Sequence, residues 1–162
     1  MPSEPIIPDP PLLALITKHE GSVATPYLDS RGFQTVGVGH NLAAHPLPGE
    51  TYPMSPERIQ AVLADDLNQV VIALGAALPW LQEIDEVRQA VLIDMGFNMG
   101  VQGLLKWPNT LKAIQNGDWQ TASDGMLGSL WAKQVGIRAQ EDATMMLTGI
   151  WPDGLYRKGT PC

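Results

Sequence analysis

The chain has 162 residues, a mass of 17.5 kDa and a formal net charge of −7 at pH 7. A chain of this length buries roughly two-thirds of its unfolded surface, and 44% hydrophobic residues supply one core without metals or disulfides. The ten Lys and Arg residues are outnumbered by 17 Asp and Glu residues, which argues against a nucleic-acid partner, because nucleic acids are bound by a basic face. The negative net charge also disfavours attraction to anionic membranes and cell walls.

The cysteine content and the first residues bear on location. The single cysteine, Cys162, excludes an intrachain disulfide and indicates a reducing compartment. The first eleven residues contain five prolines and two acids where a signal peptide has positive charge, so we expect no signal peptide. The longest apolar stretch, residues 70–81, is shorter than the roughly 20 residues that span a bilayer, so we expect no stable membrane insertion. Together these features predict synthesis in the cytoplasm.

The N-terminal third predicts a proline-rich arm, one helix and a hairpin. Residues 1–11 form the expected arm, and Pro11 suits the first position of a helix that ends at Gly21. Residues 23–38 contain strand-forming side chains on both sides of a turn sequence at residues 29–32, which predicts a small β-hairpin. The four prolines of residues 45–56 indicate a loop.

The rest of the chain predicts helices. Ser55 and Pro56 form a helix start, and apolar residues then recur with helical spacing to Leu78, before Pro79. Four or five short helices follow, separated by glycines; the clearest are residues 85–98, 109–116, 119–127 and 137–147. We therefore predict a single α+β domain of residues 1–162 with a hairpin lobe (12–55), a linking helix (56–79) and a helical lobe (80–162).

Several kinds of site are excluded by missing motifs. The Gly-Val-Gly of residues 37–39 lacks the third glycine and the helix of a dinucleotide site. The three histidines have neither zinc-site spacing nor a neighbouring cysteine, and the nucleophile elbow of serine hydrolases is absent from the sequence. We expect no metal and no cofactor.

Two carboxylates remain as candidates for chemistry. Glu20 lies in the last turn of the first helix beside an apolar stripe, whereas Asp29 lies in a polar turn. Two carboxyls in unlike surroundings are able to divide the roles of acid and base. From these positions alone, a catalytic pair and two solvent-facing acids both stay open.

The wider sequence around these carboxylates resembles the phage-type lysozymes, glycoside hydrolase family 24. The resemblance is carried by Lys-His-Glu-Gly at residues 18–21, Tyr-Leu-Asp at 27–29 and Gly-Phe-Gln-Thr-Val-Gly-Val-Gly-His at 32–40. Glu20, Asp29 and Thr35 have the family's spacings of eight and five intervening residues. The resemblance extends to the family's C-terminal lobe, where it is carried by residues 97–100, Trp131, Gln134, 138–139 and 148–151. The likeness therefore runs from about residue 12 to 151.

The resemblance implies a two-lobed lysozyme fold with the active site between the lobes, and an inverting muramidase. Its substrate is the β-1,4 bond between N-acetylmuramic acid and N-acetylglucosamine in peptidoglycan. Glu20 would protonate the leaving oxygen, Asp29 would stabilise developing positive charge and act as base toward a water, and Thr35 would position that water. Inversion implies that the two carboxyls stand roughly 6.5–9.5 Å apart.

The resemblance also implies roles for residues outside the triad. Arg138 matches an arginine that approaches the catalytic glutamate, and our hypothesis is that it holds the lobes in register; a surface arginine at a helix start is the alternative. His40 is expected to be structural and to form an ion pair with Asp66, with Asp65 as the other possible partner.

Binding residues are expected on two walls. Phe97 and Asn98 would lie on one wall, where Asn98 would reach an N-acetyl or hydroxyl group, and Gly39 and Leu42 would line the other. For the tryptophans of the helical lobe, core packing is favoured over sugar stacking; these are Trp107, Trp119, Trp131 and Trp151.

The biological context implied by the family is a phage or prophage endolysin. We expect a monomer that acts on peptidoglycan glycan strands and reaches the wall from the host cytoplasm through a separate membrane pore protein. The alternatives are a lytic transglycosylase, which would need one acid only, and a catalytically silent peptidoglycan-binding module or virion component. The retained Asp29 and Thr35 argue against these alternatives.

The negative charge is unevenly distributed. Residues 50–94 hold eight acids and two bases, whereas residues 11–49 are neutral and residues 95–162 hold six bases and five acids. The acidity therefore belongs mostly to the long helix and its flanks. An anionic glycan need not be repelled by the segments that carry the candidate site.

Overall fold

The structure is a computed structural model that describes residues 10–153. The chain divides into two compact units, Met1–Gln69 and Val70–Cys162, and the boundary lies within the helix α2 (Pro56–Ala77). The expected arm lies almost wholly outside the described residues, as does Cys162. Each unit is described by itself.

The first unit begins with helix α1 (Pro10–Glu20). Its buried residues Leu15 and Ile16 lie three and four positions after the buried Leu12, so the three form one face of the helix. Gly21, with φ +76°, ends the helix, and its N–H donates to the carbonyl of Thr17 at 2.8 Å. The predicted start and end of this helix are correct to within one residue.

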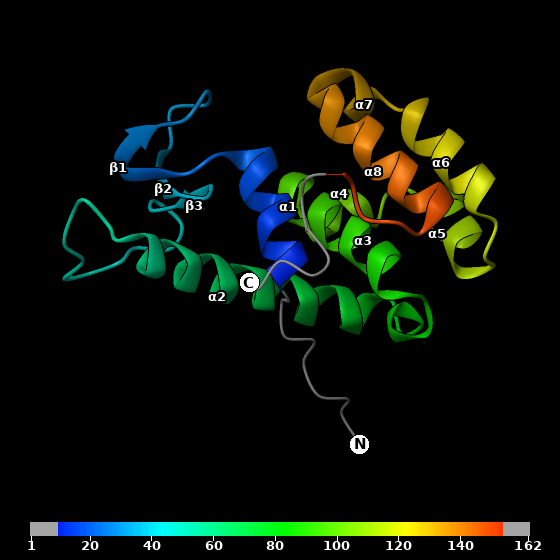
Figure 1. Ribbon diagram of the computed structural model, residues 1–162, viewed down its shortest axis with the longest axis horizontal. Helices are drawn as coiled ribbons and strands as arrows, with labels where there is room; N and C mark the ends of the chain where they lie inside the picture. Colours follow the sequence, from blue (N-terminus) through cyan, green and yellow to red (C-terminus); the bar gives the residue numbers. More distant parts are fainter. Residues whose placement is uncertain (1–9, 154–162) are drawn as a thin grey trace. The chain divides into compact units, whose positions relative to one another are not determined.

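A three-stranded antiparallel sheet follows, in the order β1 (Val23–Leu28), β2 (Gln34–Gly37) and β3 (His40–Asn41). The predicted hairpin is confirmed, and the register pairs Tyr27 with Thr35. The short third strand returns through Gly39, whose φ of +67° permits the tight turn, and pairs His40 with Val36. Figure 1 shows these strands beside their labels.

Helix α2 begins as the sequence predicted. The Ser55 hydroxyl accepts a hydrogen bond from the N–H of Arg58 at 3.1 Å, and Pro56 is the first helical residue. The helix ends at Ala77, one residue before the predicted end. In the first unit its buried face consists of Ile59, Val62, Leu63 and Leu67.

By length and composition alone, α2 is apolar enough to cross a membrane. The apolar stretch of residues 70–81 identified in the sequence overlaps only the C-terminal part of this helix. The exposed face of α2 carries Asp65 and Gln69, while Leu63 and Leu67 are buried. Because a bilayer would leave such polar groups without water, we interpret α2 as an amphipathic helix of a folded protein.

The second unit is helical. After the one-turn 3-10 helix η1 (Leu81–Glu83), its α-helices are α3 (Glu86–Met99), α4 (Val101–Leu104), α5 (Pro108–Gln115), α6 (Trp119–Leu127), α7 (Leu130–Val135) and α8 (Ile137–Thr148). Helix α8 packs against α3, α6 and α7, and Figure 1 shows it running beside α6. The prediction of four or five helices is wrong: the described part of this unit has six, because α4 and α7 are only one or two turns long and lack a full apolar period.

One arginine joins the start of α3 to the end of α8. The Arg88 guanidinium donates to the carbonyl of Met146 at 2.7 Å and of Leu147 at 3.0 Å, and to the Asp85 carboxylate at 2.9 Å. It also stacks 3.9 Å from the ring centre of Trp119. Arg88 thus satisfies carbonyls that the last turn of α8 leaves without a helical partner.

One polar contact ties the sheet of the first unit to α2. The His40 side chain is 4% exposed; its Nδ1 lies 2.7 Å from Oδ2 of Asp66 and its Nε2 lies 2.8 Å from the carbonyl of His45. Both ring nitrogens face oxygen acceptors, so both contacts are hydrogen bonds when the ring carries two protons. The expected partner of His40 is therefore Asp66, and the other possibility, Asp65, is exposed.

We expect Asp66→Asn to lower the free energy of unfolding by about 1–3 kcal/mol, because buried His40 would lose its charged partner. Asp65→Asn is the matched control on the next residue of the same helix and should change the free energy by less than about 0.5 kcal/mol. Urea denaturation of the three proteins measures both effects. Equal losses for the two variants would show that the helix, and not the ion pair, responds.

Candidate active site

Asp29 lies in the turn that joins β1 to β2. Its Oδ1 accepts hydrogen bonds from the backbone N–H of Arg31 at 2.9 Å and of Phe33 at 2.8 Å. The Asp29 N–H donates to the carbonyl of Phe33 at 2.9 Å, and the N–H of Gly32 donates to the carbonyl of Asp29 at 3.0 Å. The turn thus wraps around the carboxylate with its own backbone donors.

These donors control the ionisation of Asp29. The backbone hydrogen bond from Phe33 is the main cause that lowers the pKa of Asp29 below its ordinary value, and the hydrogen bond from Arg31 and the Arg31 charge act in the same direction. The limited desolvation of the carboxyl opposes them. Asp29 is therefore an anion at neutral pH, which is the state that a base or a stabiliser of positive charge requires.

Thr35 lies on β2 near the same turn. It is paired with Tyr27, and opposed residues of an antiparallel pair project from one face of the sheet. Asp29 comes directly after β1 ends at Leu28, in the turn that leads to β2, so it lies on the same hairpin as Thr35. The Thr35 side chain is 4% exposed, and its hydroxyl donates to the carbonyl of Phe33 at 3.0 Å. The hydroxyl oxygen keeps its capacity to accept a hydrogen bond.

Glu20 is the last residue of α1 and is half-buried. Gly21 directly follows it, and β1 begins two residues later at Val23. The three triad candidates therefore all belong to the first unit, at a helix end, a hairpin turn and a strand. The two predicted wall residues that follow the hairpin, Gly39 and Leu42, are also in this unit and are half-buried.

The predicted binding residues of the second unit lie at the end of α3. Asn98 is exposed, and its Oδ1 accepts a hydrogen bond from the indole nitrogen of Trp131 at 2.7 Å, so the amide has a fixed orientation. Trp107 packs edge-on against Trp131, with ring centres 5.9 Å apart, and Phe97 is half-buried. The 6% exposure of Trp131 agrees with the packing role favoured for the tryptophans.

Arg138 is buried near the start of α8. Its Nε lies 3.2 Å from Oδ2 of Asp94 and its NH2 group 2.7 Å from Oδ1, which is a two-point ion pair between α8 and α3. The alternative of a surface arginine is wrong, since the side chain is only 7% exposed. The expected approach of Arg138 to the catalytic glutamate stays a prediction.

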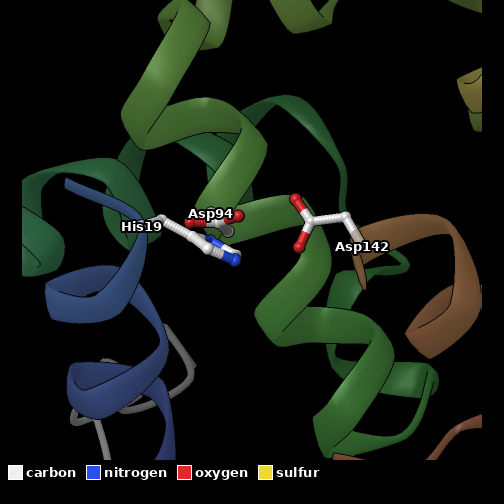
Figure 2. A group of neighbouring side chains, drawn as sticks. All are labelled: His19, Asp94 and Asp142. Carbon is white, nitrogen blue, oxygen red and sulfur yellow. The ribbon is translucent and has the colours of Figure 1, made fainter. Parts of the chain in front are cut away.

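The sequence analysis missed two buried acids, Asp94 and Asp142. Figure 2 shows the Asp142 carboxyl extending from α8 toward Asp94 on α3, and their oxygens come within 4.8 Å of each other. Each interrupts an apolar helix face, which was the available signal, because an acid at a core position needs a partner. Both carboxyls are of a type that is able to hold a metal ion, but the guanidinium of Arg138 already supplies a cation to Asp94.

A hollow of about 390 Å³ lies elsewhere in the second unit, between α8 and residues 150–153. Its lining is mostly apolar and carries two acids, Glu141 and Asp153. Arg138 and the binding residues predicted on α3 are not part of its described lining.

Comparison with known proteins decides the family. The sequence matches the phage lysozyme family over residues 17–144, a range that includes all three triad candidates and Arg138. The chain belongs to the phage lysozyme family. The eight α-helices and small antiparallel sheet of the described residues fit the α+β lysozyme-like fold of this family.

Two relatives show how this chain compares with whole proteins. It is 26% identical over 163 aligned residues to the pre-baseplate central spike protein Gp5 of Enterobacteria phage T4, with 88% of this chain but only 28% of the spike protein covered. It is 25% identical over 157 residues to the probable T4-type lysozyme 1 of Dictyostelium discoideum, with 83% of this chain and 92% of that protein covered. Family membership supports lysozyme-type glycosidase activity on peptidoglycan.

We expect the side-chain carboxyl of Asp29 to titrate below the pH range of an ordinary aspartate, as followed by the NMR shift of its carboxyl carbon. Arg31→Gln should raise this pKa only slightly, because the Arg31 charge contributes less than the backbone N–H of Phe33. A return to the ordinary pKa in Arg31→Gln would instead assign the effect to the guanidinium.

Proposed function

We propose that the chain is an inverting muramidase that hydrolyses the β-1,4 bond between N-acetylmuramic acid and N-acetylglucosamine in peptidoglycan. The observation that carries the proposal is the Asp29 carboxylate, which two backbone donors hold in its ionised form. It follows Glu20 at the family's spacing and lies on the same hairpin as Thr35. A carboxylate held in this way suits a base but not an acid.

Glu20 is the proton donor of the proposed reaction. Its proton goes to the glycosidic oxygen, so that the leaving sugar departs as a neutral alcohol while positive charge develops at the anomeric carbon. Water attacks that carbon from the opposite face and loses a proton to Asp29. The new bond forms on the face opposite the broken one, which is why the configuration inverts.

The hydrogen bonds at the hairpin suit Asp29 and Thr35 to hold this water. Both backbone bonds to Asp29 end on Oδ1, so within the described part of the chain Oδ2 is the oxygen that remains for a water proton. The Thr35 hydroxyl donates to the carbonyl of Phe33 and would accept the second proton of the water. With both protons held, a lone pair of the water oxygen is directed at the sugar.

The proposed biological role is that of an endolysin. We propose that the monomeric enzyme accumulates in the host cytoplasm and reaches the wall when a separate pore protein opens the membrane. The partial match to a spike protein favours a second candidate, a lysozyme domain of a virion component, because this chain aligns with only 28% of that relative. Mass spectrometry of purified virions separates the two roles: the peptides are absent for an endolysin and present for a particle component.

We expect Glu20→Gln to reduce the rate of turbidity loss of permeabilised Gram-negative cells about 100- to 10,000-fold, since the proton donor is lost. Glu83→Gln is the matched control: Glu83 is an exposed glutamate on η1, and its replacement should leave the rate unchanged. Full activity of Glu20→Gln in a folded protein would remove Glu20 from the mechanism.

We also expect the newly released reducing sugar to have the inverted configuration when its anomeric proton is observed by NMR before mutarotation. Mass spectrometry of the same fragments distinguishes hydrolysis, which adds a water, from transglycosylation, which leaves an anhydro sugar. Retained configuration or anhydro products would each reject the proposed mechanism.

A further inference from the structure

The acids Asp94 and Asp142 form a buried carboxyl pair that the proposed reaction does not use. Both side chains are 0% exposed, and they come from different helices, Asp94 from α3 and Asp142 from α8. Their oxygens lie within 4.8 Å of each other, and Figure 2 shows the Asp142 carboxyl extending toward Asp94. Two ionised carboxylates this close and this dry would repel each other strongly.

Among the residues of the second unit, the charges around the pair do not balance unless one carboxyl is neutral. Arg138 binds Asp94 through two of its nitrogens, and this ion pair has no net charge. Asp142 adds a second carboxyl, and neither of its oxygens has a hydrogen-bond donor among the described residues if both acids are ionised. Burying an unpaired carboxylate costs several kcal/mol, so a protein adopts such a state only with a neutralising partner.

We propose that Asp94 and Asp142 share one proton in the folded protein, and that this proton locks α8 to α3. The proton provides the missing donor: a protonated Asp142 donates to the Asp94 carboxylate, which Arg138 binds from the other side. The three side chains are then neutral together. When the proton leaves, the same buried set carries one negative charge.

The electrostatic surroundings agree with a proton on Asp142. Burial is the main cause that raises the pKa of Asp142 well above its ordinary value, and the charge and hydrogen bond of Asp94 and the charge of Glu141 add to it. Only Arg138 lowers the pKa. A proton is therefore the neutralising partner that this site binds best.

The other helices packed on α8 bring no further charge to the pair. Helix α6 presents the buried Ser123, whose hydroxyl donates to the carbonyl of Ala143 at 2.9 Å. The titratable residues of α6 and α7, Asp124 and Lys133, are exposed. His19, also drawn in Figure 2, belongs to the first unit; because histidine is the side-chain type that changes charge near neutral pH, His19 is tested separately below.

The raised pKa determines how stability depends on pH. An acid whose pKa is higher in the folded than in the unfolded protein stabilises the fold fully below the unfolded pKa, near 4, and loses this effect as pH rises through the folded pKa. Within that window, unfolding releases the shared proton. The stability of the second unit therefore falls as the pH rises above about 4.

The test uses Asp142→Asn, which keeps the shape of the side chain and stays neutral. Thermal unfolding is followed between about pH 4 and pH 8. As the pH rises, the melting temperature of the variant should increase relative to that of wild type, by roughly 3–5 °C in total for each unit by which the folded protein raises the pKa of Asp142. Near pH 6 the variant should release about one proton fewer on unfolding. The test compares how the melting temperature changes with pH. A loss of stability that the amide causes equally at every pH therefore does not affect the result.

Two controls and one direct measurement keep the proposal falsifiable. Asp124→Asn, an exposed acid on α6, should keep the wild-type slope, and so should His19→Gln. In the wild-type protein, the NMR shifts of the carboxyl carbons of Asp94 and Asp142 should show that one carboxyl is still protonated near pH 6. This measurement does not depend on whether Asp142→Asn folds. Three results would each overturn the proposal. The pH dependence of the melting temperature is the same in Asp142→Asn as in wild type, or it is lost in His19→Gln instead, or both carboxyls are ionised at pH 6.

Discussion

The cost of taking carboxylates out of water governs the polar architecture of this protein. Four aspartates illustrate this cost, each with a different neutralising partner. Asp29 has backbone N–H groups, Asp66 has an imidazole and Asp94 has a guanidinium. For Asp142 we propose a proton. In an interior of low dielectric, these partners are what allow acids to stand beside the apolar residues that hold the elements together.

The same physics separates carboxylates that perform chemistry from those that support the fold. A base must remain ionised and must meet water. Asp29, the base of the proposed reaction, fits both conditions because its donors come from a partly exposed turn. Asp94 is equally well paired, but it is fully buried and its partner comes from a different helix. Burial and the origin of the donors, more than the residue type, therefore indicate which role a carboxyl has.

The sequence predicted elements wherever local signals were strong. Helix α2 was placed closely because Ser55 caps it, Pro56 begins it and its apolar residues keep the helical period. The His40–Asp66 contact and the family were accessible through the resemblance. The short helices α4 and α7 were missed because one or two turns lack a full apolar period. The acids Asp94 and Asp142 each interrupt an apolar helix face, but the sequence does not show that Asp94 pairs with Arg138, which lies 44 positions away. The distance between the triad carboxyls remains a prediction.

The hairpin turn at Asp29 has an evolutionary consequence. The two side-chain bonds and the two backbone bonds that define it all join residues within five positions of sequence. Changes elsewhere in the chain leave these bonds intact, so loops and helices are free to diverge while the ionised carboxylate persists. Other surfaces of the chain are thus able to change without rebuilding the group that we propose to act on the water.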